Sequence, residues 1–463
     1  MEGKYNKLLN NSLIFAIGNL GSKLITFLLV PLYTYVLSTT EFGIVDLSTT
    51  ITTMLLPVVS LCIYEAVLRF SIKEKEPIKI LNNSLALIVI SNMLMLIIAI
   101  TLLIILKNYL IIYLCLILIF QNFQSVLSQY ARAVGKVKLF AANGIVMTLG
   151  LLISNIFLLV VLKLGIKGYL ISIIISNIVS IIFLTINLNI LNKINIKVID
   201  KNLLKSMLKY SLPLIPNTLM WWVINASSRI FIVYYLDASQ NGLFAVSSKI
   251  PTILNIFYAI FFQAWQLSAI EEYKSENSSE YYSLVFRYLS FVLLILSSIL
   301  IVFIQPLMSV LVASNFYESW KYIPILLLAN IFSSFSSFVG TTYTVSMNTK
   351  GVFYSSLTGA IISIILNFIL IPSLGIIGAA ISQVISFLFI WIFRHIQTNN
   401  MVKIEIKFQT IISIIIVVFQ TIVATIITST SLFYIFQIIL LTLIIIVNFN
   451  NIRNIKGLIL KFV

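Results

Sequence analysis

Long runs of apolar residues, separated by short polar segments, form the main pattern of this sequence. A helix needs about 20 mostly apolar residues to cross the hydrocarbon core of a bilayer. About fourteen runs satisfy this, at roughly 12–36, 44–68, 82–105, 109–131, 139–162, 168–190, 210–236, 243–269, 284–312, 321–346, 352–372, 376–396, 408–428 and 431–449. Very short turns separate the third run from the fourth, the fifth from the sixth, and the last two, so the count depends most on those pairs. The pattern predicts an all-α polytopic membrane protein.

Composition supports this class and excludes a soluble globular domain. Apolar residues make up 60% of the chain and charged residues only 10%, whereas soluble chains are about 45–50% apolar. The first ten residues are polar and the first apolar run is long enough to span and remain, so we expect no cleavable signal peptide. Cys62 and Cys115 lie in apolar runs and are expected to be reduced packing residues.

The net charge of +16 follows from the predicted topology. Cytoplasmic loops of membrane proteins carry an excess of lysine and arginine. With the N-terminus inside, the predicted outer loops and helix interiors hold few of the 30 basic residues: Lys107, Lys163, Lys167, Lys321, Lys23, Arg229 and Lys249. All the others fall on the cytoplasmic side. This asymmetry predicts that both termini are cytoplasmic, and it explains the charge without a nucleic-acid partner.

The chain repeats itself over about half its length. LGIKG at 164–168 leads into the sixth predicted helix, and LGIIG at 374–378 leads into the twelfth. We therefore predict a six-helix lobe at 1–190, a cytoplasmic linker at 191–209, a second six-helix lobe at 210–397 and an additional helix pair at 398–463. Parallel repeats of this kind are a transporter architecture with the substrate site between the halves.

Three cations lie within predicted spans, namely Lys23, Arg229 and Lys249. A charge near the bilayer centre costs at least about 2.5–3.5 kcal/mol on insertion scales, so it needs a partner or a hydrated cavity. Arg229 and Lys249 lie closer to the outer surface, where snorkelling is the alternative explanation. Arg132 ends the fourth predicted helix, where the positive-inside rule alone also accounts for it. Buried cations with few buried anions predict a negatively charged substrate.

Polar side chains recur at helical spacing in the same helices. In the first and fourth helices each stripe falls within an arc of roughly 60° at 100° per residue. The predicted polar lining of a cavity is Ser12, Asn19, Thr26, Gln121, Ser125, Ser128, Asn217, Asn225, Gln263 and Gln266. Hydrogen bonds between helices are the alternative role for these side chains.

The sequence offers no set of residues for enzymatic chemistry. It has no phosphate-binding glycine loop with a following lysine, and its one histidine, His395, lies at a helix end. No loop exceeds about 20 residues, so no soluble catalytic module is predicted. We expect no cofactor, no metal ion and no enzymatic activity.

Several motifs give the sequence a family resemblance. YSLPLIP at 210–216, Ser228-Arg229, Gly242 and KIP at 249–251 resemble the second half of bacterial polysaccharide flippases. QAW at 263–265 and the glycine turn at 374–378 are similar to the same family, which belongs to the multidrug/oligosaccharidyl-lipid/polysaccharide exporter superfamily. Members often carry aspartate before the arginine of the seventh helix, and this chain has Ser228 there.

The resemblance implies a flippase that moves an undecaprenyl-pyrophosphate-linked oligosaccharide from the cytoplasmic to the outer leaflet of the bacterial inner membrane. It implies alternating access, O-antigen or capsule synthesis, and a polysaccharide polymerase and glycosyltransferases as neighbouring proteins. A cation or drug exporter of the same superfamily is one alternative, although its cavity would contain acidic residues. A sugar-lipid polymerase is the enzymatic alternative, and it would need a sizeable outer loop.

Overall fold

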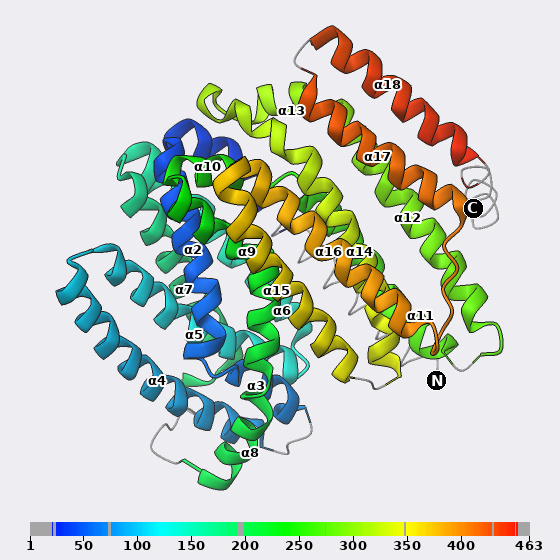
Figure 1. Ribbon diagram of the computed structural model, residues 1–463. Coiled ribbons are helices and arrows are strands. Elements are labelled where there is room, and N and C mark those ends of the chain that lie inside the picture. The colour runs from blue at the N-terminus through cyan, green and yellow to red at the C-terminus, as the bar shows by residue number, and fades with distance from the viewer. Residues whose placement is uncertain are drawn as a thin grey trace. The chain divides into compact units, whose positions relative to one another are not determined.

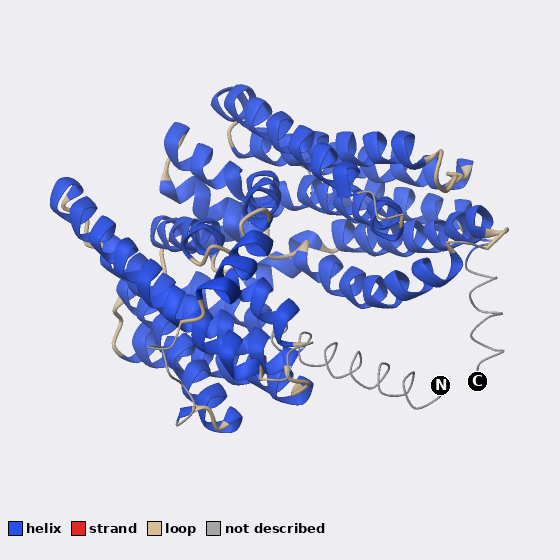
Figure 2. Ribbon diagram, turned by 90° about the horizontal axis from the view of Figure 1, so that it is seen from below, coloured by secondary structure: helices blue, strands red, loops and turns tan. Residues whose placement is uncertain are grey.

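The computed structural model describes residues 21, 25–72, 76–191, 199–273, 275–346, 349–427, 430–449 and 451. These residues form helices and loops and contain no strand (Figure 2), which confirms the all-α prediction. The chain divides into two compact units, Met1–Trp222 and Val223–Val463. The predicted lobe and linker boundaries stay predictions.

The first unit is a bundle of helices around an apolar core. It contains a helix at Ile25–Val36, then α2 (Thr39–Val59), α3 (Ile63–Ser71), α4 (Pro77–Leu106), α5 (Leu110–Ala133), α6 (Val137–Asn155), the π-helical turn η1 (Ile156–Val161), α7 (Gly165–Leu188) and α8 (Lys201–Ser211). Ile63, Ile80, Val126 and Met207 are fully buried where α3, α4, α5 and α8 meet. The side chain of Asp200 caps α8 by accepting from the amides of the next turn, which satisfies donors that a helix start leaves unpaired.

The second unit is organised around α14. After α9 (Leu214–Tyr235), which contains the boundary between the units, come α10 (Ala238–Ser247), α11 (Thr252–Glu272), α12 (Ser278–Val302), α13 (Ile304–Leu311), the 3₁₀ helix η3 (Ser314–Tyr322), α14 (Ile323–Val345), α15 (Thr349–Leu374), α16 (Ile376–Thr398), α17 (Phe408–Ile426) and α18 (Thr430–Val447). Most of α14 is buried, and it packs against α11, α12, α16 and α17. α17 and α18 lie beside α12 (Figure 1).

Ten helices in the described part of the chain are long and apolar enough to cross a membrane, or eleven if the bent pair α10–α11 is one span. Two shorter apolar helices, Ile25–Val36 and Ser431–Val447, accompany them. The fourteen-span count and the orientation of the termini stay predictions.

Three of the predicted continuous spans are broken, and the run predicted at 284–312 divides at Phe303 into α12 and α13. The run predicted at 44–68 divides into α2 and α3, because Pro57 lies inside α2 and Leu61 and Cys62 adopt left-handed backbone angles of 53° and 49° in φ. The run predicted at 243–269 bends by 45° between α10 and α11. Pro251 begins α11 as its N-cap residue, and proline cannot donate the amide hydrogen bond that would continue a helix.

The repeated glycine motif has the same local geometry in both units. The first glycine of each copy, Gly165 and Gly375, has a positive φ of +54° and +62°, which glycine adopts without strain. A Cβ on the second glycine of each copy would lie 3.1 Å from the Leu158 carbonyl oxygen at Gly168 and 2.2 Å from the Leu370 carbonyl oxygen at Gly378. Both copies thus turn the chain and then pack it directly against the preceding helix.

Candidate functional site

Helix α9 places two of the predicted site residues one turn apart on the same face. The guanidinium of Arg229 donates from Nη1 to the backbone oxygen of Asn225 at 3.3 Å and lies 5.5 Å from the centre of the Phe244 ring. Cation–π contact and a carbonyl acceptor both stabilise a guanidinium without neutralising it. These contacts position the Arg229 guanidinium on this face of α9.

Ser228, the departure from the family pattern, is directed to another helix. Its hydroxyl donates to Oδ1 of Asn367 at 3.1 Å, and Nδ2 of Asn367 donates to Ser227 at 3.1 Å. These buried contacts join α9 to α15, so Ser228 serves helix packing.

Arg229 and Asn225 line a cavity of about 200 Å³ within the second unit. Its walls come from α9, the α10–α11 bend, α14 and α16, and its lining residues are Asn225, Arg229, Ser248, Pro251, Asn255, Leu326, Ala329, Asn330, Ser333, Gln383 and Phe387. Sites for drug-sized ligands usually measure about 300–1,000 Å³. A cavity of this size suits a single small polar group, such as one sugar ring or one phosphate.

Hydrogen bonds between the walls hold the cavity together. Nε2 of Gln383 donates to the backbone oxygen of Asn225 at 3.4 Å. Nδ2 of Asn330 donates to the backbone oxygen of Pro251 at 3.2 Å, which ties α14 to the α10–α11 bend. The Oδ1 atom of Asn330 is buried and accepts no hydrogen bond within the described part of the chain. It is an acceptor available to a hydroxyl group of a ligand, since a buried polar group left unpaired costs about 1–3 kcal/mol.

The cavity has one sign of charge. Among the described residues that line it, Arg229 is the charged one, and the polar remainder are amides and hydroxyls. Amides and hydroxyls exchange hydrogen bonds with sugars, and a guanidinium binds phosphate in a geometry matched to its fork. The arrangement can therefore hold an anionic or sugar-like group and disfavours a cation.

Lys249 and Gln266 are not among the described residues that line this cavity. Lys249 is half-buried next to Ser248 in the α10–α11 bend, and Gln266 is exposed on α11. The side chain of Gln263 lies outside the described residues.

In the first unit, Ser12, Asn19 and Lys23 lie outside the described residues. Thr26 is exposed and Asn217 is half-buried on α9. A cavity-lining role for these residues stays a prediction.

The predicted polar residues of α5 differ in whether their side chains already have hydrogen-bond partners. Ser125 donates to the Asn122 carbonyl within its own helix at 2.9 Å, and Ser128 is buried. The Oε1 atom of Gln121 is buried without a hydrogen-bond partner in the described chain. Arg132 is exposed in the last turn of α5, 5.9 Å from the Phe140 ring. Of this stripe, Gln121 has the unpaired polar atom that a ligand could meet.

The structure adds a buried cation that the sequence analysis assigned to the cytoplasmic side. Arg394 is 2% exposed in the last turns of α16. It donates from Nε to Ser355 at 2.9 Å, from Nη1 to the Ser336 carbonyl at 3.1 Å and from Nη2 to Ser356 at 3.2 Å. These contacts connect α14, α15 and α16, so Arg394 acts as an interhelical clasp. The sequence pattern places Arg394 on the cytoplasmic side because the predicted span at 376–396 ends only two residues after it.

No group of three or more histidine, cysteine, aspartate or glutamate side chains that could hold a metal ion occurs in the described residues.

Comparisons with known proteins agree with the fold. A family model described as polysaccharide biosynthesis protein matches residues 8–266. The lipid II flippase MurJ in an inward closed conformation superimposes with a TM-score of 0.67 at 14% identity, covering 96% of this chain and 100% of that chain. No curated protein shows significant similarity to the sequence.

Multidrug transporters share the same fold. An inward-facing multidrug resistance MATE family transporter of the MOP superfamily gives a TM-score of 0.58 at 13% identity over 85% of this chain and 94% of that chain. A mutant of the Vibrio cholerae MATE transporter VcmN gives 0.57 at 14% identity over 85% and 97%. With its apolar helices, the chain is a multi-pass membrane protein that has the fold of these transporters and flippases.

Proposed function

The chain belongs to the polysaccharide biosynthesis protein family, and from this premise we propose that it is a flippase for a lipid-linked oligosaccharide. The substrate is an undecaprenyl-pyrophosphate-linked repeat unit, which the protein moves from the cytoplasmic to the outer leaflet of the bacterial inner membrane for O-antigen or capsule synthesis. A polysaccharide polymerase and glycosyltransferases are its proposed neighbours.

The observation that carries this proposal is the Arg229 cavity, where the described lining places this arginine among amides and hydroxyls. An unpaired polar group costs several kcal/mol in hydrocarbon, so neither a pyrophosphate nor a sugar crosses unaided. In such a cavity the guanidinium can bind the pyrophosphate, and the neutral groups can hydrogen-bond to the sugar. Both parts then keep partners in place of water. The polyprenyl tail needs no such site and can stay in the lipid.

Transport follows the alternating-access scheme of transporters built from parallel repeats. Lys23 holds the headgroup at mid-depth, and Arg229 and Lys249 draw it toward the outer side. Arg132 is the first cation that the headgroup meets at the cytoplasmic end of α5. The polar side chains predicted along these helices line the route.

A cation or drug exporter is the second candidate, because the multidrug transporters share the fold. A cation-binding site would be expected to present a carboxylate. The charge of the Arg229 cavity is the opposite, which favours the flippase. A sugar-lipid polymerase has less support, because the structures that share this fold are transporters and flippases.

The test uses purified full-length protein in liposomes with a fluorescent undecaprenyl-pyrophosphate oligosaccharide in one leaflet, and measures its appearance in the other. Arg229→Gln removes the charge and keeps much of the volume, and we expect the rate to fall at least about tenfold, the effect of about 1.4 kcal/mol. Arg229→Lys should retain part of the rate. Arg69→Gln is the matched control, because Arg69 is an exposed arginine on α3, outside the cavity.

Each outcome separates the candidates. Transfer that is lost in Arg229→Gln and in Lys23→Ala, and kept in Arg69→Gln, supports the flippase and its cationic site. Transfer by Arg229→Gln at the unaltered rate would remove Arg229 from the mechanism. Export of a cationic dye from the same liposomes, without transfer of the oligosaccharide, would establish the exporter instead.

A further inference from the structure

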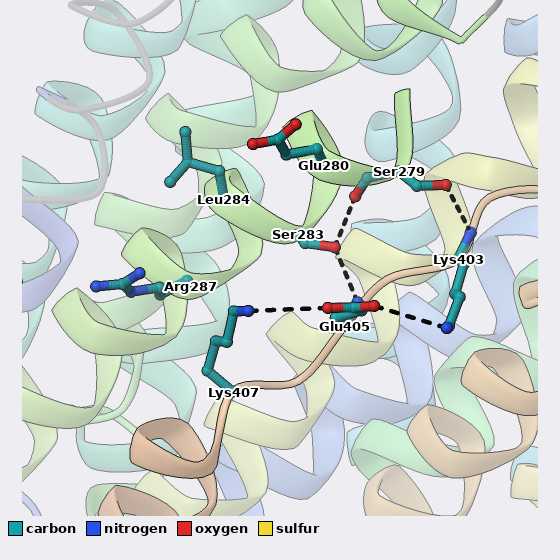
Figure 3. Close-up of a pocket in the computed structure, with 8 residues that line it drawn as sticks. All are labelled: Ser279, Glu280, Ser283, Leu284, Arg287, Lys403, Glu405 and Lys407. Atoms are coloured by element: carbon teal, nitrogen blue, oxygen red, sulfur yellow. Dashed lines mark hydrogen bonds and ion pairs between the residues drawn. The ribbon is translucent and has the colours of Figure 1, made fainter. Parts of the chain in front are cut away.

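A second, larger pocket lies at one end of two membrane spans in the second unit. It measures about 480 Å³ and is lined by Ser279, Glu280, Ser283, Leu284, Arg287, Lys403, Glu405 and Lys407. The first five residues come from the start of α12, and the last three from the extended segment that precedes α17 (Figure 3). It shares no residue with the Arg229 cavity.

The sequence of the extended segment explains which side chains face the pocket. Val402 and Ile404 are 2% and 3% exposed, whereas Lys403, Glu405 and Lys407 are exposed. Successive side chains of an extended chain point to opposite sides. The apolar residues therefore anchor the segment in the core, and the three charged residues share the open side.

Backbone hydrogen bonds fix this segment against α12. The amide of Lys403 donates to the hydroxyl of Ser279 at 3.3 Å, and the amide of Glu405 donates to the hydroxyl of Ser283 at 2.8 Å. The Lys403 and Lys407 ammonium groups lie 3.6 Å and 3.8 Å from the two carboxylate oxygens of Glu405 (Figure 3). Glu405 thus holds both lysines at the pocket.

Arg287 completes the cationic side of the pocket and is itself held in place. Its Nε atom donates to Oδ1 of Asn451 at 2.7 Å, and Nη2 donates to the same oxygen. Asn451 in turn donates to Asn448, whose amide donates to Ser413 on α17 at 2.8 Å. Three cations against the two carboxylates of Glu280 and Glu405 leave the pocket with a net positive charge.

The location of the pocket selects the class of ligand. α12 and α17 both begin here, and both are long and apolar enough to span a membrane. Just beyond the charged groups, Leu284, Phe408, Ile411 and Ile415 are 44%, 74%, 43% and 60% exposed. A cationic pocket at the level of the lipid headgroups, continuous with apolar helix faces, matches a molecule with an anionic head and acyl chains.

We infer that this pocket binds the phosphate headgroup of an anionic phospholipid from the surrounding bilayer, with the acyl chains against α12 and α17. Basic side chains near a membrane surface each strengthen binding of anionic lipid. The site is independent of the flippase proposal, because it uses none of the residues of the Arg229 cavity.

The test measures lipid binding to the purified full-length protein in detergent by native mass spectrometry. Phosphatidylglycerol and phosphatidylcholine with the same acyl chains are the two probes. The Lys403→Gln/Lys407→Gln double variant should bind phosphatidylglycerol about 25-fold more weakly, at roughly fivefold for each lysine. The control double variant, Lys79→Gln/Lys350→Gln, removes two exposed lysines outside the pocket and should bind it like the unaltered protein.

A variant that should bind phosphatidylglycerol more tightly distinguishes a lost contact from misfolding, because misfolding would not strengthen binding. Glu280→Gln removes a carboxylate that repels the phosphate, leaves the contacts of Glu405 in place, and should tighten phosphatidylglycerol binding several-fold. The inference is overturned by an equal loss in both double variants, or by equal binding of the two lipids to the unaltered protein. It is also overturned if millimolar inorganic phosphate displaces the lipid, because the pocket would then be a site for a free anion.

Discussion

Replacing Gly340 with alanine would place a methyl group against the buried guanidinium of Arg394. The added Cβ would lie 2.5 Å from Nη1 and 3.4 Å from Cζ of Arg394. The shorter distance is a steric clash. Arg394 must then move, although its three nitrogens are held by Ser336, Ser355 and Ser356 on two other helices.

The expected effect can be estimated from these contacts. Losing one hydrogen bond to a charged group costs about 1.5–3 kcal/mol, while glycine to alanine inside a helix returns about 0.5–1 kcal/mol. Gly340→Ala should therefore destabilise the protein by about 1–2 kcal/mol. Gly150→Ala is the matched control, because its nearest heavy atoms lie at 3.6–3.7 Å, and it should be neutral or stabilising.

The measurement is equilibrium unfolding by sodium dodecyl sulfate in mixed detergent micelles, followed by tryptophan fluorescence. A double-mutant cycle with Arg394→Met isolates the contact, since removing the guanidinium removes the clash. Gly340→Ala should then cost nothing further in the Arg394→Met background. Equal stability of Gly340→Ala and Gly150→Ala, or additive effects in the cycle, would refute this account of the clasp.

Three further changes test other contacts by the same unfolding measurement. Trp265 is 2% exposed and lies 4.4 Å, ring to ring, from Phe338, so Trp265→Ala should cost about 3–5 kcal/mol; a cost below about 1 kcal/mol would contradict that burial. Tyr33→Phe removes the acceptor of a 3.0 Å bond from Asn155 and should cost about 1 kcal/mol, with no change arguing against the bond. Gln437→Leu removes a 3.0 Å hydrogen bond from the side chain of Gln437 on α18 to the Gln420 carbonyl on α17. It should cost about 0.6–1.7 kcal/mol of stability, the range for hydrogen bonds between membrane helices. A gain in stability would contradict a stabilising role for this hydrogen bond.

Helix positions could be predicted from the sequence because hydrocarbon length is a strict requirement that a run of apolar residues reveals directly. Breaks within those runs were missed for a physical reason. Leu61 and Cys62 are apolar, so a count of apolar residues passes over them, although their left-handed backbone ends α2. Pro251 was visible, but a count of apolar residues does not give the 45° bend between α10 and α11, where Asn330 of α14 donates to the Pro251 carbonyl.

The candidate cavity was predictable only in part. Asn225 and Arg229 are four apart, and helical spacing places them on one face. Asn330 and Gln383 come from α14 and α16, more than a hundred residues further along the chain, and only the packing of those helices brings them beside Arg229. Each is a single amide in an apolar run, which was the available signal.

The duplicated glycine turn has a consequence for engineering the chain. In both copies the backbone requirement falls on the two glycines, whereas the residue before the second glycine differs, Lys167 in one and Ile377 in the other. The two copies of the turn therefore accommodate a lysine and an isoleucine at this position while the glycines stay the same. Labels attached at positions 167 and 377 would occupy matching positions in the two glycine turns, so each label would report on the turn of its own unit.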